Sequence, residues 1–174
     1  MQDNYNTDDS LTVNELQQTP LPTGLNVLTI LTMVGCVIFL FFVVFGFFSA
    51  KSTYEKKDEI LAQMNSKEMP AFAKTMMGDP ANFEAMVVKS YENRLPILIL
   101  SLVGLGLCFV GALQMRKRKK QGYLFYVIGE LLPFVTQALF IGFFAISGFT
   151  SIFFIAIAIL FILLYTMQRK HLVY

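Results

Sequence analysis

The chain of 174 residues is too apolar for an ordinary soluble domain, since hydrophobic residues make up 55% of it and 18 residues are phenylalanine. Its 14 Lys and Arg residues and 12 Asp and Glu residues nearly balance, which gives a formal net charge of +2. These charges are segregated from long apolar blocks, and Glu130 is the only charge between residues 123 and 168. The composition therefore excludes a soluble globular domain and predicts an integral membrane protein.

The first 24 residues contain acidic side chains but neither Lys nor Arg. A cleaved signal peptide needs a basic segment followed by a short apolar one, and the apolar block that starts at residue 25 is too long for that role. We therefore expect residues 1–24 to form a disordered, acidic cytoplasmic tail.

Three apolar blocks follow this tail. Residues 25–50 and 95–115 are each long enough to cross a hydrocarbon core of about 30 Å, at a helical rise of about 1.5 Å per residue. The block 123–168 is too long for one span, and the Gly and hydroxyl residues at 146–150 predict a tight turn between two spans. The blocks lack the alternation typical of β-barrel strands. Transmembrane helices are thus expected at residues 25–49, 96–115, 123–146 and 150–168.

The charged segment 51–95, between the first two expected spans, is also predicted to be helical. Asp79 followed by Pro80 is a typical helix start, and the apolar residues after it recur at helical spacing. We therefore predict an all-α, polytopic integral membrane protein. Residues 25–174 are expected to form one domain, a four-transmembrane-helix bundle with a helical extracytoplasmic loop at 51–95.

A compact run of cations between the second and third spans determines the expected orientation. Four spans put this run on the same side as both termini, and the positive-inside rule places that side in the cytoplasm. Segment 51–95 also holds seven Lys or Arg residues, but they are scattered among acids. We therefore expect a protein of the cytoplasmic (inner) membrane with cytoplasmic N- and C-termini. The run comprises Arg116, Lys117, Arg118, Lys119 and Lys120.

The expected contact of this cationic run is with lipid headgroups. Five residues between two spans offer little surface for nucleic acid, so nucleic acid is not an expected partner.

Glu130 is the candidate functional residue, and Tyr126 and Gln137 fall near the same face of the third predicted helix. A charge at bilayer depth costs at least about 2.5–3.5 kcal/mol, so it is expected to face an interior polar pocket and to bind a cation or proton, or to order the bundle. Alternatively, Tyr123 and Tyr126 form an interfacial belt, and Glu130 is a helix-start carboxylate stabilised by the helix dipole. The sequence alone favours this second, structural role.

Small residues at helical spacing form stripes on two predicted spans, and such stripes let helices approach closely in lipid. They are expected to be intramolecular contacts, although a dimer seam would have the same pattern. Cys36 and Cys108 are expected to be packing residues and not a disulfide. The stripes are Ser101, Gly104, Cys108 and Gly111 on the second span, and Ala138, Gly142 and Ala145 on the third.

No motif indicates an enzyme, because the sequence contains no nucleophile–base pair, HExxH motif, phosphate-binding glycine loop or Cys/His cluster. Its one histidine is His171. We therefore expect no enzymatic activity, no cofactor and no bound metal. Five methionines of the loop are too irregularly spaced to predict a Cu(I) site. These are Met64, Met69, Met76, Met77 and Met86.

The favoured function is that of an accessory or assembly subunit that acts through helix–helix contacts. The lipid bilayer is its expected partner, and other membrane proteins or a second copy of the chain are alternative partners. The rival hypothesis is an oligomeric channel or transporter for a small ion or proton, which would use Glu130 and Gln137.

Overall fold

The computed structural model describes residues 21–65, 70, 72, 77–169 and 172. The regular secondary structure of these residues is entirely helical, which confirms the all-α part of the predicted fold class. Most of the predicted acidic tail lies outside the described residues, as do Met69, Met76 and His171.

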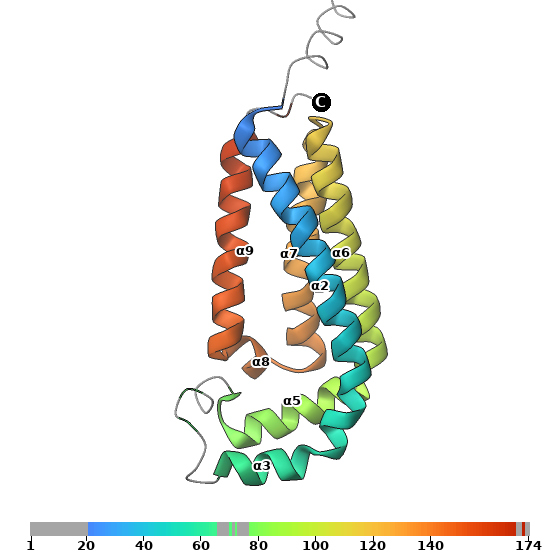
Figure 1. Ribbon diagram of the computed structural model, residues 1–174, viewed down its shortest axis with the longest axis vertical. Coiled ribbons are helices and arrows are strands. Elements are labelled where there is room, and N and C mark those ends of the chain that lie inside the picture. Colours follow the sequence, from blue (N-terminus) through green and yellow to red (C-terminus); the bar gives the residue numbers. More distant parts are fainter. Residues whose placement is uncertain (1–20, 66–69, 71, 73–76, 170–171, 173–174) are drawn as a thin grey trace, which may run out of the picture.

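Four helices are long and apolar enough to cross a membrane, as the sequence predicted (Figure 1). The first continues beyond its apolar block, in agreement with the helical pattern expected after residue 50. The chain is therefore a multi-pass membrane protein by the length and composition of its helices. The four helices are α2 (Thr23–Glu55), α6 (Arg94–Arg116), α7 (Lys120–Phe140) and α9 (Phe149–Gln168).

The third predicted span was placed too far along the chain, because α7 ends at Phe140 and not at residue 146. Gly142 has φ +123°, a conformation that residues with a side chain rarely adopt, so the chain breaks there. The short helix α8 (Phe144–Ser147) follows. Gly148 then caps α9, inside the predicted turn.

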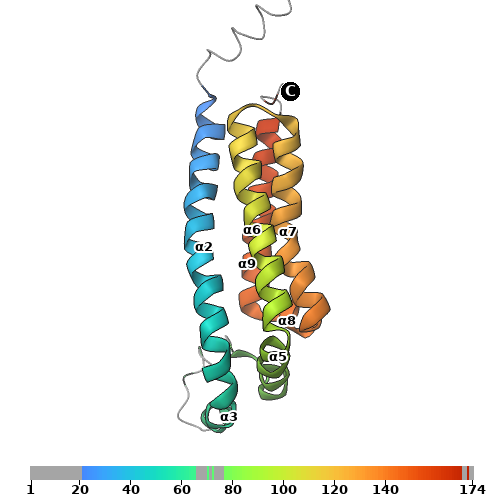
Figure 2. The same cartoon turned by 90° about the vertical axis from the view of Figure 1, so that its right-hand side faces the viewer.

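The four long helices run side by side, and the two ends of the molecule differ (Figures 1 and 2). The start of α2, the α6–α7 connection and the last turn of α9 lie at one end. At the other end lie α8 and two further helices, α3 (Lys57–Asn65) and α5 (Pro80–Glu92). We call the first the basic end, because the run of five cations lies there, and the second the cap end.

The closest helix pair is α6 and α7, and glycines make this closeness possible. A Cβ atom on Gly111 would lie 2.7 Å from the carbonyl oxygen of Gly122, and one on Gly129 would lie 2.6 Å from that of Gly104. Real Cβ atoms do not approach so closely, so Gly111, Gly122 and Gly129 depend on the absence of a side chain, and a Cβ on Gly104 would be tight at 3.1 Å from the Gly129 oxygen. Close backbone packing of this kind is the main source of helix association in lipid.

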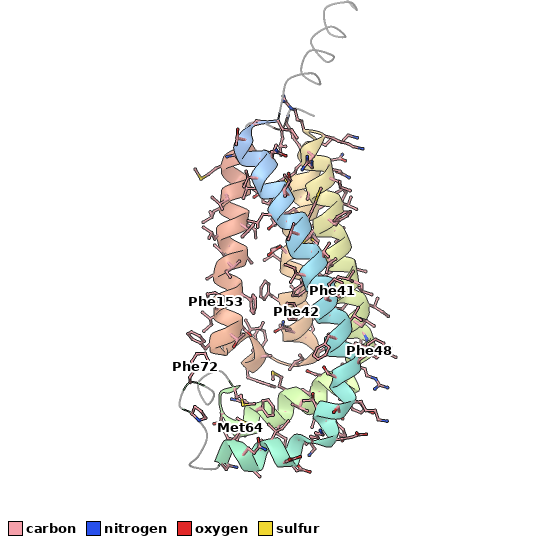
Figure 3. All side chains as sticks on the ribbon, viewed as in Figure 1. Phe41, Phe42, Phe48, Met64, Phe72 and Phe153 are labelled. Carbon is pink, nitrogen blue, oxygen red and sulfur yellow. The ribbon has the colours of Figure 1, made fainter. Side chains whose placement is uncertain are left out.

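The other two long helices pack less closely. The buried residues of α2 all lie in its first half, between Leu25 and Cys36, and in α9 only Ala158 and Tyr165 are buried. Most apolar side chains of the long helices are exposed, as expected for helices that face lipid. The labelled Phe41, Phe42 and Phe48 of Figure 3 belong to this exposed set.

Helices α3 and α5 pack on each other through a small apolar cluster. Met64 of α3 contacts Phe83 and Val87 of α5, and all three are buried (Figure 3 labels Met64). The Asp79 side chain accepts a hydrogen bond from the backbone N–H of Ala81 at 2.8 Å, so the predicted helix start is present.

An ion pair and aromatic contacts also join this region. Lys57 of α3 lies 3.5 Å from Glu84 of α5 and 3.2 Å from Asp58. Its hydrogen bond to Asp58 is the main reason that its pKa is raised. The rings of Tyr54 and Tyr91 stack at 4.5 Å, which ties the end of α2 to α5.

Candidate functional site

Glu130 lies in the middle of α7. It is the eleventh of the 21 residues of this helix, which places it about 15 Å along the helix axis from Lys120. The interpretation as a helix-start carboxylate required Tyr126 to lie in an interfacial belt. Tyr126 is 1% exposed and packs among the long helices. Ten residues of α7 lie on each side of Glu130, so Glu130 is more than two helical turns from either end of the helix.

One face of α7 packs against the other long helices. Gly122, Tyr126 and Gly129 are buried at spacings of four and three residues, and Glu130 follows directly at the edge of this face. Pro133 lies inside the helix and has no backbone N–H. The carbonyl group of Gly129 therefore lacks its usual intrahelical partner next to Glu130.

A cavity of about 510 Å³ lies between all four long helices, and Glu130 and Gln137 both line it. Most of its wall is apolar, with aromatic rings from α2, α7 and α9. Its remaining lining residues supply hydroxyl, thiol, amide and carboxyl groups. These polar residues are Thr32 and Cys36 of α2, Cys108 of α6, Tyr126, Glu130 and Gln137 of α7, and Thr150 and Ser151 of α9.

The Glu130 carboxyl group has two polar neighbours at the inner part of the cavity. The Cys108 thiol lies 3.6 Å from its Oε2 atom and 3.7 Å from the backbone oxygen of Tyr126. The Tyr126 phenol also interacts with this carboxyl group. A thiol and a phenol are both neutral donors, so they leave the charge of an ionised Glu130 uncompensated. Among the described residues that line the cavity there is no Lys, Arg or His.

Two tyrosines pack against each other toward the basic end, and one of them, Tyr126, lines the cavity. The rings of Tyr126 and Tyr165 are 4.5 Å apart, and each residue is 1% exposed. The Tyr165 hydroxyl lies 2.7 Å from the Thr32 hydroxyl, so a hydrogen bond joins α9 to α2 at this level. The ring contact between Tyr126 and Tyr165 thus lies between two sets of polar contacts, Thr32 with Tyr165 and Glu130 with Tyr126 and Cys108.

Toward the cap end, the cavity extends to the last turns of α7 and the first turn of α9, where Gln137, Thr150 and Ser151 line it. Gln137 accepts backbone hydrogen bonds from Ile141 and Gly142, each at 3.0 Å, where α7 ends. Ser151 donates to the backbone oxygen of Ala145 in α8. The cavity thus extends from Tyr126 to the α7–α9 connection, and it is about half open to the surface of the molecule.

The predicted packing residues have different locations. Gly104, Cys108 and Gly111 are buried where α6 meets α7, whereas Ser101 lines a second, smaller cavity between α2 and α6. Ala138 is half-buried, and Gly142 lies beyond the end of α7.

The glycines of α7 that meet α6 are Gly122 and Gly129, which sequence reasoning missed. A usable signal was present, because Gly104 and Gly111 are seven residues apart and so are Gly122 and Gly129. Equal spacing on neighbouring antiparallel helices lets both pairs meet.

The cationic run forms the tight connection between α6 and α7. Arg118 has φ +57°, and the next N–H, that of Lys119, donates to the carbonyl of Gln114 at 3.0 Å. With the bond from Arg118 to Met115, this is a Schellman motif, in which glycine is the usual residue at the left-handed position. Arg116 ends α6, Lys117 follows it and Lys120 begins α7, so all five cations gather at one end of the helix pair.

Among the residues that the structure describes, no group of three or more His, Cys, Asp or Glu side chains lies close enough to hold a metal ion. The polar residues that line the cavity include one carboxyl group, and one carboxyl group can pair with a single positive charge or hold a proton.

No family model, curated protein or solved structure matches the chain.

Proposed function

We propose that the chain is a non-enzymatic membrane protein that binds a cation or a proton at Glu130 and carries it through the membrane. One observation supports this most strongly: a carboxyl group in the middle of a long apolar helix lines a large cavity that has no basic lining residue among those described. Insertion of such a group costs at least about 2.5–3.5 kcal/mol, which a purely structural role would not require. Glu130 is the binding residue, and Gln137 lines the path toward the cap end.

The proposal includes a topology. The four long helices form a transmembrane bundle in the cytoplasmic membrane, with the basic end and both termini in the cytoplasm. Helices α3 and α5 then form an extracytoplasmic cap, and the cavity is reached from that side. The Tyr126–Tyr165 pair separates Glu130 from the cytoplasm. A movement that opens this pair and closes the other end would give alternating access.

Labelling of single engineered cysteines tests the topology. A cysteine at Glu84 should react with a membrane-impermeant maleimide in intact cells, whereas one at Arg118 should react only after the membrane is permeabilised. The parent protein is the background control, since Cys36 and Cys108 are both buried. Reaction of the residue 118 variant in intact cells would reverse the orientation.

Flux measurements test the carrier function. The purified protein in liposomes should give proton or cation flux under an imposed gradient, and Glu130→Gln should reduce that flux at least tenfold, because the amide cannot carry the negative charge. Glu92→Gln is the matched control, since it makes the same change at an exposed position of α5. Equal flux from wild type and Glu130→Gln would refute the proposed role of Glu130.

A second candidate function is lateral contact with another membrane protein, as an accessory or assembly subunit. The observation that favours it is a stripe on the second half of α2, where Phe41, Phe45 and Phe48 are 70%, 72% and 73% exposed at helical spacing. Changing all three to Leu keeps the helix apolar but removes the rings. If this variant loses a partner that the wild type retains in mild detergent, while transport is unaffected, the lateral role is supported.

A further inference from the structure

The cavity is much larger than a bound proton or bare metal ion requires. Its volume is about 510 Å³, whereas one water molecule takes up about 30 Å³. Sites for small organic molecules have volumes of about 300–1,000 Å³. The size of the cavity therefore indicates an organic ligand with a substantial body.

The wall of the cavity indicates that this body is apolar. Phe39 of α2, Phe134 of α7 and both Phe154 and Phe161 of α9 line it, so aromatic rings come from three sides. Hard metal cations bind about six or more oxygen ligands, and the oxygen-bearing groups here are divided between the two ends of the cavity. The faces of aromatic rings instead attract organic cations through cation–π interactions.

The charge of the cavity determines the charge of the ligand. Glu130 is the only ionisable carboxyl group among its described lining residues, and no basic side chain there neutralises it. A single positive charge on the ligand would pair with this carboxylate in a setting of low polarity, where an unpaired charge is costly. A dication would leave one charge without a partner.

We infer that the ligand is an amphipathic organic monocation, such as a protonated amine or quaternary ammonium ion with an apolar body, whose charge lies at Glu130 and whose body packs among the cavity phenylalanines. This inference rests on the proposed function and names its substrate class. Gln137, Thr150 and Ser151 provide a polar border at the cap end of the cavity, past which the cation enters.

Binding of radiolabelled tetraphenylphosphonium to the purified full-length protein in detergent tests this inference. We expect saturable binding that apolar quaternary ammonium ions displace and that Na⁺ or K⁺ at 100-fold excess does not. Glu130→Gln should weaken binding at least tenfold. An uncharged analogue, triphenylphosphine oxide, should not compete.

A second pair of variants keeps the test valid if Glu130→Gln folds poorly. Phe154 lines the cavity and its neighbour Phe153 does not, although the two are 53% and 56% exposed on the same helix. Phe154→Leu should weaken tetraphenylphosphonium binding about threefold to tenfold, whereas Phe153→Leu should leave it unchanged. Equal effects of the two changes would overturn the placement of the ligand.

The outcomes also separate this inference from the proposed function. Flux of protons or inorganic cations that depends on Glu130, without saturable tetraphenylphosphonium binding, would refute the organic monocation and retain the carrier. Absence of both flux and binding would refute both. Saturable binding that is insensitive to Glu130→Gln would refute the role of the Glu130 carboxylate both in the carrier and in the binding of the organic monocation.

Discussion

The two halves of the membrane region are built differently. Helices α6 and α7 meet through glycines at backbone distance, as the 2.7 Å separation between a Cβ on Gly111 and the Gly122 oxygen indicates. Helix α9 contributes only Ala158 and Tyr165 as buried residues and forms one wall of the cavity. Close backbone packing fixes two helices relative to each other, whereas a wall with few buried contacts can move at lower cost.

In the proposed carrier, this difference would give the two halves separate roles. The α6–α7 pair would hold Glu130 and Cys108 in place, and α9 would be the element whose movement opens or closes the cavity. A carrier needs both properties, since its binding residue must keep its geometry while access changes from one side to the other. Four predictions test whether α6 and α7 form a fixed pair and whether α9 is a movable wall of the cavity.

The largest effect is expected from a side chain at the α6–α7 interface. Gly111→Ala would place Cβ 2.7 Å from two backbone atoms, so the helices must separate, at a cost of about 3 kcal/mol. The matched control is Gly106→Ala on the same helix, where a Cβ meets nothing within 4 Å. It should be neutral or slightly stabilising, because Ala favours helix. Reversible unfolding in mixed micelles measures the stability of both variants. Similar losses of stability would contradict the claim that close glycine contacts hold α6 and α7 together.

How far the sequence predicted this fold depends on the kind of signal. The long apolar blocks predicted the four apolar helices, since length and hydropathy are local properties. The end of α7 was missed because Gly142 was assigned to a stripe of small residues, and its left-handed conformation depends on how the chain turns toward α8. Because glycine has no side chain, the sequence does not distinguish a glycine that packs against another helix from one that ends its own helix.

The candidate site was predicted in part. Spacing placed Tyr126, Glu130 and Gln137 near one face of a helix, and the structure puts all three on one cavity. Thr32 is a hydroxyl residue inside an apolar block, so a hydrogen bond to another helix could be expected, but nothing in the sequence pairs it with Tyr165, which lies 133 positions away. Which helix faces are brought together is a tertiary property that a single sequence does not reveal.

The next effect concerns the connection between the fixed pair and the movable wall. Gly142→Ala places a side chain at φ +123°, at a cost of about 2 kcal/mol, and should displace α8 and the start of α9. Gly148→Ala is the control, since Gly148 has φ −66° and open space around its Cβ position. Stability and the rate of proton or cation flux should both fall for Gly142→Ala only. An unaffected Gly142→Ala protein would show that the connection does not position α9.

A smaller effect is expected from the hydrogen bond between Thr32 and Tyr165, which joins α2 to α9 near Glu130. Thr32→Val and Tyr165→Phe each remove the 2.7 Å contact between the two hydroxyl groups. A double-mutant cycle should give a coupling energy of about 1 kcal/mol, within the range known for hydrogen bonds between transmembrane helices. A coupling energy much above the cost of Gly111→Ala would mean that α9 is held as firmly as α6 and α7 hold each other. The two halves would then not differ in how tightly they pack.

The smallest effect is expected from a change that stabilises only the connection between α6 and α7. Arg118→Gly places glycine at the left-handed position of the Schellman motif and should stabilise the protein by about 0.5 kcal/mol, because the strain of a side chain at φ +57° is relieved. Lys117→Gly, one residue earlier at φ −86°, should instead be destabilising. Neither change touches the cavity, so tetraphenylphosphonium affinity should stay the same in both variants. A change in affinity would show that the α6–α7 connection and the cavity are coupled, and that the pair is not the fixed half of the molecule.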